Sequence, residues 1–266
     1  MKIGIFDSGI GGISVLHEAL LRLPDQEYFF YADTDHVPYG LRSSEEILRY
    51  ADEIISDLVG RGADAVVIAC NTATAVAAEY VRQKYDIPII GMEPAVKPAL
   101  RSSGSSRVLV MATPVTIREN KLHSLLERLD KDHLVDLLEM PDLVSFAENE
   151  IFEDEEVDNY IEKRLEGLDI TNYSEVVLGC THFNYFKPAI KKAFGSDIEL
   201  IDGNIGTVNH LADTLGLKIK SIERLDEEMN GFRDNTLYLL SGREAGAEEM
   251  ERFARLHARL EKMRKI

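Results

Sequence analysis

Two stretches of the sequence share one pattern: Val66-Val67-Ile68-Ala69-Cys70-Asn71-Thr72 and, in the second half of the chain, Val176-Val177-Leu178-Gly179-Cys180-Thr181-His182. Each begins with an apolar run typical of a buried strand and continues with a cysteine and short polar residues. A second pair recurs at nearly the same spacing, because Ile5-Phe6-Asp7-Ser8 matches Val110-Met111-Ala112-Thr113. The sequence therefore predicts a duplicated α/β unit with its two cysteines at equivalent positions.

Short apolar runs alternate with amphipathic stretches along most of the chain. We expect strands at residues 3–6, 28–32, 65–69, 87–90, 107–111, 134–138, 175–178, 198–201 and 235–240. We expect helices at residues 13–22, 44–59, 74–84, 117–129, 155–165, 188–194 and 247–260, with Ser44 as N-cap of the second. This alternation is typical of parallel sheets with helices on both faces. The predicted fold is therefore α/β, with two pseudo-symmetric parallel-sheet domains and an active site in the cleft between them.

The domain division follows from the repeat. We expect residues 1–95 and 208–266 to form the first domain, which carries Asp7, Ser8 and Cys70. Residues 96–207 are expected to form the second domain, which carries Cys180 and His182.

Composition excludes several classes of protein. The chain has 266 residues, with 30 Lys and Arg against 47 Asp and Glu, so its formal net charge is −17. A surface of that sign repels nucleic-acid phosphates, while a hydrophobic content of 45% predicts a packed core rather than disorder. Two cysteines make no disulfide framework, and Asp7 comes too early for a secretory signal peptide. No apolar run reaches the roughly 18 residues of a membrane span. We therefore expect a soluble cytoplasmic protein that binds neither nucleic acid nor membrane.

Each cysteine follows a predicted strand and precedes a helix-like segment. Parallel sheets bind ligands at the carboxyl ends of their strands, and a helix N-terminus at that point favours a thiolate. If the two halves face each other, one thiolate can remove a proton while the opposite thiol returns one. Three other interpretations stay open at this point: buried apolar fillers, a redox-active pair, and a zinc site made by Cys70, Cys180 and His182.

Two further stretches also follow predicted strands. Asp7-Ser8-Gly9-Ile10-Gly11-Gly12 has glycines that let backbone N–H groups approach a carboxylate or phosphate, although it is neither a Walker A loop nor a Gly-x-Gly-x-x-Gly run. In Asp33-Thr34-Asp35-His36-Val37-Pro38-Tyr39-Gly40, the proline and glycine shape a loop from which Asp33 and Tyr39 can reach the same cleft. A simple tight turn and a solvated loop without a role are the alternative interpretations.

Together these motifs resemble the ordered motif set of the glutamate racemases, which are cofactor-independent members of the aspartate/glutamate racemase superfamily. The resemblance covers about residues 3 to 210 and rests on four stretches: Phe6-Asp7-Ser8-Gly9-Ile10-Gly11-Gly12, Asp33 with Pro38-Tyr39-Gly40, Ala69-Cys70-Asn71-Thr72-Ala73, and Leu178-Gly179-Cys180-Thr181-His182. One departure is Phe183-Asn184-Tyr185-Phe186, where the family usually has a Tyr-Pro-Leu type sequence. That departure puts the wall of the second-domain pocket in question, but not the chemistry.

The resemblance implies a role for each matching residue. Cys70 and Cys180 are expected to be the catalytic acid/base residues, assisted by Asp7 and His182 respectively. The substrate-contacting residues are expected to be Asp7, Ser8, Tyr39, Gly40, Asn71, Thr72, Thr113, Thr116, Thr181 and His182. Glu148 resembles an acidic residue near the family's site, but a solvated acid is an equally good interpretation. The implied protein is a homodimer that needs no cofactor or metal and makes D-glutamate for peptidoglycan.

Chemistry agrees with this resemblance. Most racemases use pyridoxal phosphate to stabilise the carbanion that α-proton removal leaves, yet no lysine here has the strand-end context of the cysteines. The alternatives are an aspartate racemase, a thiol redox or metal-binding protein, and a degenerate racemase that regulates a partner such as a topoisomerase. The intact cysteine motifs disfavour the last of these.

Overall fold

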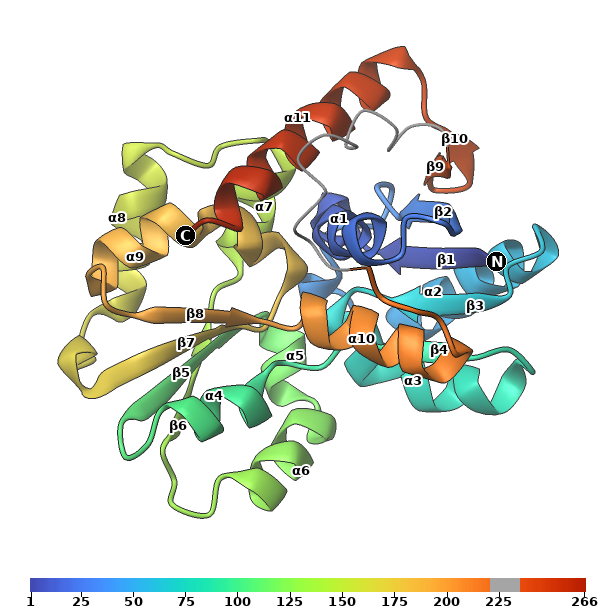
Figure 1. Ribbon diagram of the computed structural model, residues 1–266. Coiled ribbons are helices and arrows are strands. Elements are labelled where there is room, and N and C mark those ends of the chain that lie inside the picture. Colours follow the sequence, from blue (N-terminus) through green and yellow to red (C-terminus); the bar gives the residue numbers. More distant parts are fainter. Residues whose placement is uncertain (221–234) are drawn as a thin grey trace.

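The structure is a computed structural model that describes residues 1–220 and 235–266, and it contains two β-sheets (Figure 1). In the described residues the larger sheet has six strands, ordered β10-β9-β2-β1-β3-β4, and the smaller has four, ordered β6-β5-β7-β8. The larger sheet consists of β1 (Lys2–Asp7), β2 (Glu27–Ala32), β3 (Ala65–Ile68), β4 (Ile89–Gly91), β9 (Thr236–Leu240) and β10 (Arg243–Glu244). The smaller sheet consists of β5 (Arg107–Ala112), β6 (Val135–Glu139), β7 (Tyr173–Leu178) and β8 (Glu199–Asp202).

The strand order repeats between the two sheets. β2-β1-β3-β4 of the larger sheet corresponds to β6-β5-β7-β8 of the smaller one, with β1 and β5 as the central strands. All of these strands pair in parallel, and their inward residues, such as Ile5, Val67, Val110 and Val177, are almost fully buried. The predicted α/β class with duplicated parallel sheets is confirmed. Only β10 runs antiparallel among the described strands, as a short edge strand against β9.

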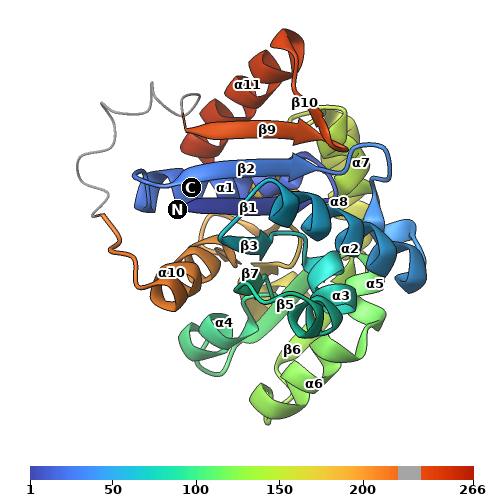
Figure 2. The ribbon, with the colours of Figure 1, turned by 90° about the vertical axis from the view of Figure 1, so that its right-hand side faces the viewer.

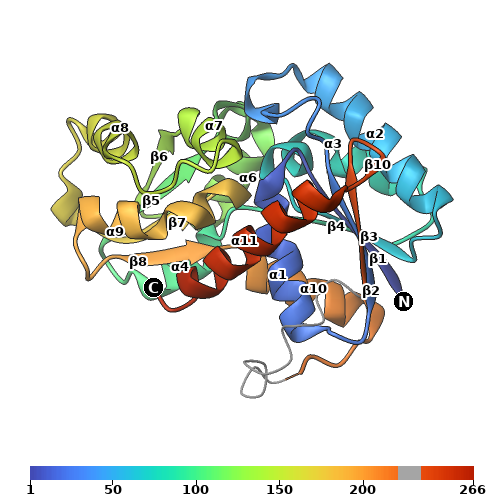
Figure 3. The ribbon, with the colours of Figure 1, turned by 90° about the horizontal axis from the view of Figure 1, so that it is seen from above.

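Helices cover both sheets, and one long helix crosses the molecule. The helices beside the larger sheet are α1 (Ile13–Arg22), α2 (Ser44–Gly60), α3 (Asn71–Lys84) and α10 (Asn204–Leu215). Those of the smaller sheet are α4 (Val96–Ser102), α5 (Pro114–Arg118), α6 (Asn120–Leu129), α7 (Asp142–Glu148), α8 (Glu155–Leu165) and α9 (Lys187–Phe194). The helix α11 (Ala247–Met263) lies across α1 and extends over both halves (Figure 3). Figure 2 shows β9, β2, β1 and β3 stacked in order, with β7 and β5 beyond them.

Several local expectations need correction. Ser43, not Ser44, is the N-cap of α2, because its side chain accepts the Glu46 N–H in a capping box. The helix expected at residues 117–129 is two helices, separated at Glu119, whose backbone is extended. The helix-like segment expected after Cys180 is a 3-10 helix, Thr181–Phe186, which leads into α9. Helices α4, α7 and α10 were not predicted.

The expected division into residues 1–95 with 208–266 and residues 96–207 stays a prediction. Its first part includes residues 221–234, which lie outside the described residues. Within the described ranges, no helix is both long and apolar enough to cross a membrane.

Two buried histidines join α1 to α11. His17 Nδ1 lies 3.0 Å from His257 Nδ1, and His17 Nε2 lies 3.2 Å from a carboxylate oxygen of Glu261. On the other side, the Tyr238 hydroxyl lies 3.1 Å from His257 Nε2. Burial lowers the pKa of His17 to about 4 although Glu261 opposes the shift, and burial together with His17 also lowers the pKa of His257. Both rings are therefore neutral in the folded protein at pH 7.

This pair predicts that the protein loses stability in mild acid. An unfolded histidine binds a proton near pH 6.5, whereas folded His17 does so only near pH 4, so the free energy of unfolding falls as the pH drops through this window. His17 alone should cost about 2 kcal/mol by pH 5. Thermal unfolding at pH 7.5 and pH 5 measures the loss, with His17→Gln as comparison. An equal loss in that variant would show that other groups cause it.

Candidate active site

The carboxyl edges of the two sheets meet in the middle of the molecule. Asp7 ends β1, and Thr181 follows β7 of the other sheet. The Thr181 hydroxyl donates a hydrogen bond of 3.0 Å to Asp7 Oδ2. Every site residue expected from the sequence is buried here, namely Asp7, Ser8, Tyr39, Gly40, Cys70, Asn71, Thr72, Thr113, Thr116, Cys180, Thr181 and His182. The two halves therefore meet at this edge, through the contact between Thr181 and Asp7.

Cys70 caps the N-terminus of α3. Its Sγ accepts the Ala73 N–H at 3.4 Å, and its thiol lies 3.9 Å from the Ser8 hydroxyl. The Ser8 hydroxyl in turn lies 3.4 Å from Asp7 Oδ1, so a chain of polar groups joins the thiol to the carboxylate. Burial raises the pKa of the Cys70 thiol, and the neighbouring Asp7 carboxylate raises it further. In this closed arrangement these effects favour the protonated thiol of Cys70.

Cys180 has a different partner. Its Sγ lies 3.7 Å from His182 Nδ1, and His182 Nε2 lies 2.8 Å from Glu148 Oε1. Burial lowers the pKa of His182, but hydrogen bonds to Cys180 and Glu148 outweigh that effect and raise it well above its usual range. The Gly11 N–H also faces Nε2, at 3.3 Å, but the Glu148 carboxylate is closer and accepts the Nε2 proton, so in the neutral ring Nδ1 is an acceptor that faces the thiol. Cys180, His182 and Glu148 thus form a chain of polar contacts that can accept the thiol proton.

Glu148 therefore belongs to the site. It ends α7, and its Oε1 also accepts the Ile10 N–H at 2.8 Å, so the solvated-acid interpretation is wrong. Arg252 of α11, which the sequence analysis did not identify, contacts Glu148. Sequence offers no local signal for this contact, because α7 and α11 meet only in the folded chain.

The backbone N–H groups of the glycine turn after β1 donate to acidic side chains of the protein itself. Gly9 N–H donates to Asp7 Oδ1 at 3.1 Å, and Ile10 N–H is taken by Glu148, so these donors are not free for a ligand as the motif suggested. The glycines are required by close packing instead. A Cβ on Gly9 would lie 1.8 Å from Glu148 Oε1, and a Cβ on Gly11 would lie 2.4 Å from His182 Nδ1.

Three threonines form a second bridge between the halves. Thr72 Oγ1, at the start of α3, lies 2.8 Å from Thr113 Oγ1 and 3.2 Å from Thr116 Oγ1. The Thr113 and Thr116 hydroxyls are 2.9 Å apart. Gly40 packs against Thr113, where an added Cβ would lie 2.9 Å from the threonine Cβ. These hydroxyls form a buried polar cluster beside the cysteines.

Two expected contact residues point to other partners. The Tyr39 hydroxyl donates to Asp33 Oδ2 at 2.6 Å, and Asp33 also accepts from Ser241. The Asn71 amide donates to the Met92 sulfur, and Asn71 Oδ1 is buried and has no hydrogen-bond partner among the residues that the structure describes. Asn71 therefore keeps an unused acceptor close to Cys70.

The segment that departs from the family pattern, residues 183–186, contributes to the hydrophobic core. The aromatic rings of Phe183, Tyr185 and Phe186 are fully buried, and the Tyr185 hydroxyl donates to the Ile10 carbonyl at 3.1 Å. The departure therefore ties the second half to the glycine turn of the first.

The alternative cysteine interpretations receive no support from the geometry. Both thiols are free, and Cys70 and Cys180 are 6% and 7% exposed. Within residues 1–220 and 235–266, no cluster of three His, Cys, Asp or Glu side chains has the arrangement of a metal site. Because each sulfur has its own polar partner, simple apolar filling does not describe either cysteine.

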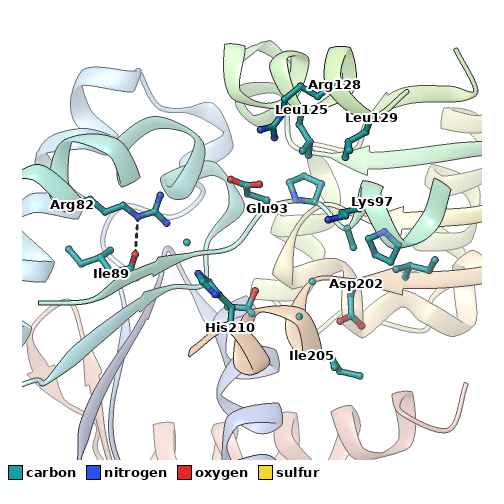
Figure 4. Close-up of a pocket in the computed structure, with 18 residues that line it drawn as sticks. Arg82, Ile89, Glu93, Lys97, Leu125, Arg128, Leu129, Asp202, Ile205 and His210 are labelled. Atoms are coloured by element: carbon teal, nitrogen blue, oxygen red, sulfur yellow. Dashed lines mark hydrogen bonds between the residues drawn. The ribbon is translucent and has the colours of Figure 1, made fainter. Parts of the chain in front are cut away.

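A large cleft lies elsewhere between the halves (Figure 4). It has a volume of about 1130 Å³ and lies among β4, α3, α6, β8 and α10. Its labelled side chains include Arg82, Lys97, Arg128, Glu93 and His210, and neither Cys70 nor Cys180 is among the described residues that line it. The cysteine site, by contrast, is closed by direct contacts between its own side chains.

Comparison with known proteins gives consistent matches over most or all of the chain. The family model for Asp/Glu/Hydantoin racemase matches residues 13–211. The chain is 45% identical to the glutamate racemase of Lachnospira eligens and 46% identical to that of Campylobacter curvus, and each match covers 100% of both chains. Among solved structures, it is similar to Escherichia coli glutamate racemase in complex with L-glutamate and the activator UDP-MurNAc-ala. That likeness has a TM-score of 0.77 and 26% identity, and it covers 92% of this chain and 99% of that chain.

Proposed function

Because this chain belongs to the Asp/Glu/hydantoin racemase family, we propose that it interconverts L- and D-glutamate with its two cysteines as the acid and the base. The resemblance drawn from the sequence motifs is confirmed, and the chain is an isomerase of the amino-acid racemase type. One observation carries the choice of catalytic groups. Two buried thiols follow equivalent strands of two facing sheets, and each has its own polar partner.

In the proposed reaction, one proton is removed from Cα of glutamate and another is added to the opposite face of Cα. Cys180 gives its proton to His182 Nδ1, and the resulting thiolate removes the α-proton from one face of Cα. Cys70, which burial and Asp7 keep protonated, donates its proton to the opposite face. The configuration at Cα is thereby inverted, and the thiols exchange roles in the reverse direction. After product release His182 gives its extra proton to solvent and the Cys70 thiolate takes one up, which restores the starting state.

The carbanion formed in this step is very basic, so its charge must be held by oriented donors in a site without bulk water. The threonine cluster and the amide of Asn71 supply hydroxyl and N–H donors beside the cysteines. We propose that the two halves separate to admit glutamate, which then replaces direct contacts such as Thr181 to Asp7. Reclosure excludes water from the reacting atoms.

The remaining roles are proposals on the same basis. Asp7 assists Cys70, His182 assists Cys180, and the substrate contacts are the residues inferred from the family resemblance: Asp7, Ser8, Tyr39, Gly40, Asn71, Thr72, Thr113, Thr116, Thr181 and His182. We further propose that D-glutamate is supplied to peptidoglycan synthesis. Cytoplasmic location, a homodimer and independence from cofactor and metal stay predictions of the family resemblance.

The substrate is tested with purified, chelator-treated protein and either L-glutamate or L-aspartate, without added pyridoxal phosphate. Circular dichroism or chiral chromatography follows the loss of optical purity. We expect glutamate to racemise to equal amounts of both enantiomers and aspartate to react far more slowly. Faster turnover of aspartate would identify the neighbouring specificity instead. Activity that appears only with added pyridoxal phosphate or metal would refute the proposed chemistry.

A further inference from the structure

We propose that Arg252 of α11 is a positioning residue for catalysis, which holds Glu148 so that His182 presents Nδ1 to Cys180. This inference rests on the proposed function, since it concerns the Cys180 half of the same site. Its residues come from three separate segments, namely α7, the 3-10 helix after Cys180, and α11.

The contact between Arg252 and Glu148 has two parts. The Arg252 guanidinium donates from Nη2 to the backbone carbonyl of Glu148, the last residue of α7. The same Nη2 lies 3.7 Å from the carboxylate oxygen Oε2, while the other oxygen, Oε1, is used by His182 and by the Ile10 N–H. A cation at the C-terminus of a helix is also favourable for the helix dipole. Arg252 therefore fixes both the backbone and the charge of Glu148.

The turn after α7 is also bound by arginines of α11. Glu150 has a φ of 56°, a left-handed conformation that is uncommon for a residue with a side chain. Arg252 Nε donates to Glu150 Oε1 at 3.1 Å, and Arg255 Nη2 donates to the same oxygen at 3.1 Å. Arg252 and Arg255, which are three residues apart on α11, thus both bind the loop after α7. Of these two arginines, Arg252 also contacts Glu148.

The position of Glu148 decides which nitrogen of His182 carries the proton. Two groups face Nε2 of His182, the Glu148 carboxylate at 2.8 Å and the Gly11 N–H at 3.3 Å. The carboxylate is closer and is an acceptor, so in the neutral ring the proton lies on Nε2 and the lone pair of Nδ1 faces Cys180. A displaced Glu148 leaves the ring free to take the other tautomer, which cannot accept the thiol proton. Among the described residues, the titratable groups that interact with His182 are Cys180, Glu148 and Asp7, and Arg252 contacts one of them, Glu148.

The chain offers a matched control for this role. Arg255 lies on the same helix, pairs with the same Glu150, and is 60% exposed, against 26% for Arg252. Arg252→Met and Arg255→Met remove equal charge and similar volume. Arg252→Lys keeps the charge but not the forked donors, so it should recover only part of the activity.

The first test measures turnover. Arg252→Met should lower kcat for glutamate by about 10- to 100-fold with a much smaller change in KM, because a displaced proton acceptor slows chemistry more than binding. Arg255→Met should stay near the parent protein. In a Glu148→Gln background, Arg252→Met should have little further effect, because the acid through which it acts is already gone. Equal losses in the two arginine variants, or additive losses with Glu148→Gln, would overturn the proposal.

The second test needs no turnover and so separates this inference from the proposed function. Iodoacetamide labelling across pH, mapped by mass spectrometry, reports Cys70 and Cys180 individually. Arg252→Met should slow labelling of Cys180 at neutral pH and shift its profile to higher pH, because a less stable imidazolium no longer favours the thiolate. Cys70 should keep its parental profile and so confirm that the variant is folded. Parallel changes at both cysteines would indicate a general structural role and refute the assignment.

Discussion

Cys70→Ala and Cys180→Ala should each abolish racemisation of glutamate, with a loss of at least about 10⁴-fold. The reason is that the proposed reaction needs an acid and a base on opposite faces of Cα, and each alanine variant keeps only one of them. Cys→Ser variants should keep at most a trace of activity, since a hydroxyl is a much weaker acid than a thiol. Chiral chromatography after long incubation detects residual turnover.

Stability is the control for the cysteine variants. Both sulfurs are buried, so each truncation leaves a small void and lowers the melting temperature modestly. Circular dichroism should show both variants folded at the assay temperature. Substantial racemisation by either folded alanine variant would contradict the two-thiol assignment.

Gly11→Ala should reduce kcat/KM by about 100-fold or more although it lies in neither cysteine motif. A Cβ at this position would lie 2.4 Å from His182 Nδ1 and 2.4 Å from Thr181 Oγ1. Such distances force one or both side chains to move. His182 Nδ1 is the atom that faces Cys180, and Thr181 is the donor to Asp7, so movement of either disturbs the site.

Gly60→Ala is the matched control, because an added Cβ at Gly60 meets nothing within 4 Å. It should have parental activity and stability. The Gly11 variant is compared with it by steady-state kinetics and thermal unfolding. A Gly11→Ala protein that is folded and fully active would show that the close packing of the glycine turn on His182 has no catalytic importance.

The repeated strand pattern was sufficient to predict the sheets. Apolar runs ending at Asp7, Cys70, Thr113 and Cys180 give the carboxyl edges where the site forms, because side chains buried on both faces leave a strong local signal. The unpredicted helices lack such signals. Helices α4 and α7 have seven residues each, about two turns, which is too few to show a helical repeat of apolar residues, and α10 begins with Asn204-Ile205-Gly206.

The partners within the site were harder to predict than its members. The role of Glu148 depends on His182 and Ile10, which are distant in sequence, and no local pattern distinguishes it from its acidic neighbours. For the glycine turn, the sequence suggested a role that the structure does not show. Its glycines suggested donors for a ligand, whereas Asp7 and Glu148 take those donors, and the lack of side chains serves close packing.

Deuterium incorporation at Cα tests the two-thiol mechanism most directly. L-glutamate and D-glutamate are each incubated with the protein in deuterated water, and the early product and the remaining substrate are separated and analysed by mass spectrometry. If two opposed thiols act, the early product carries a solvent deuteron while the remaining substrate keeps its original α-proton, in both directions. A product that retains the substrate's own proton, or a substrate that exchanges faster than it racemises, would contradict the account.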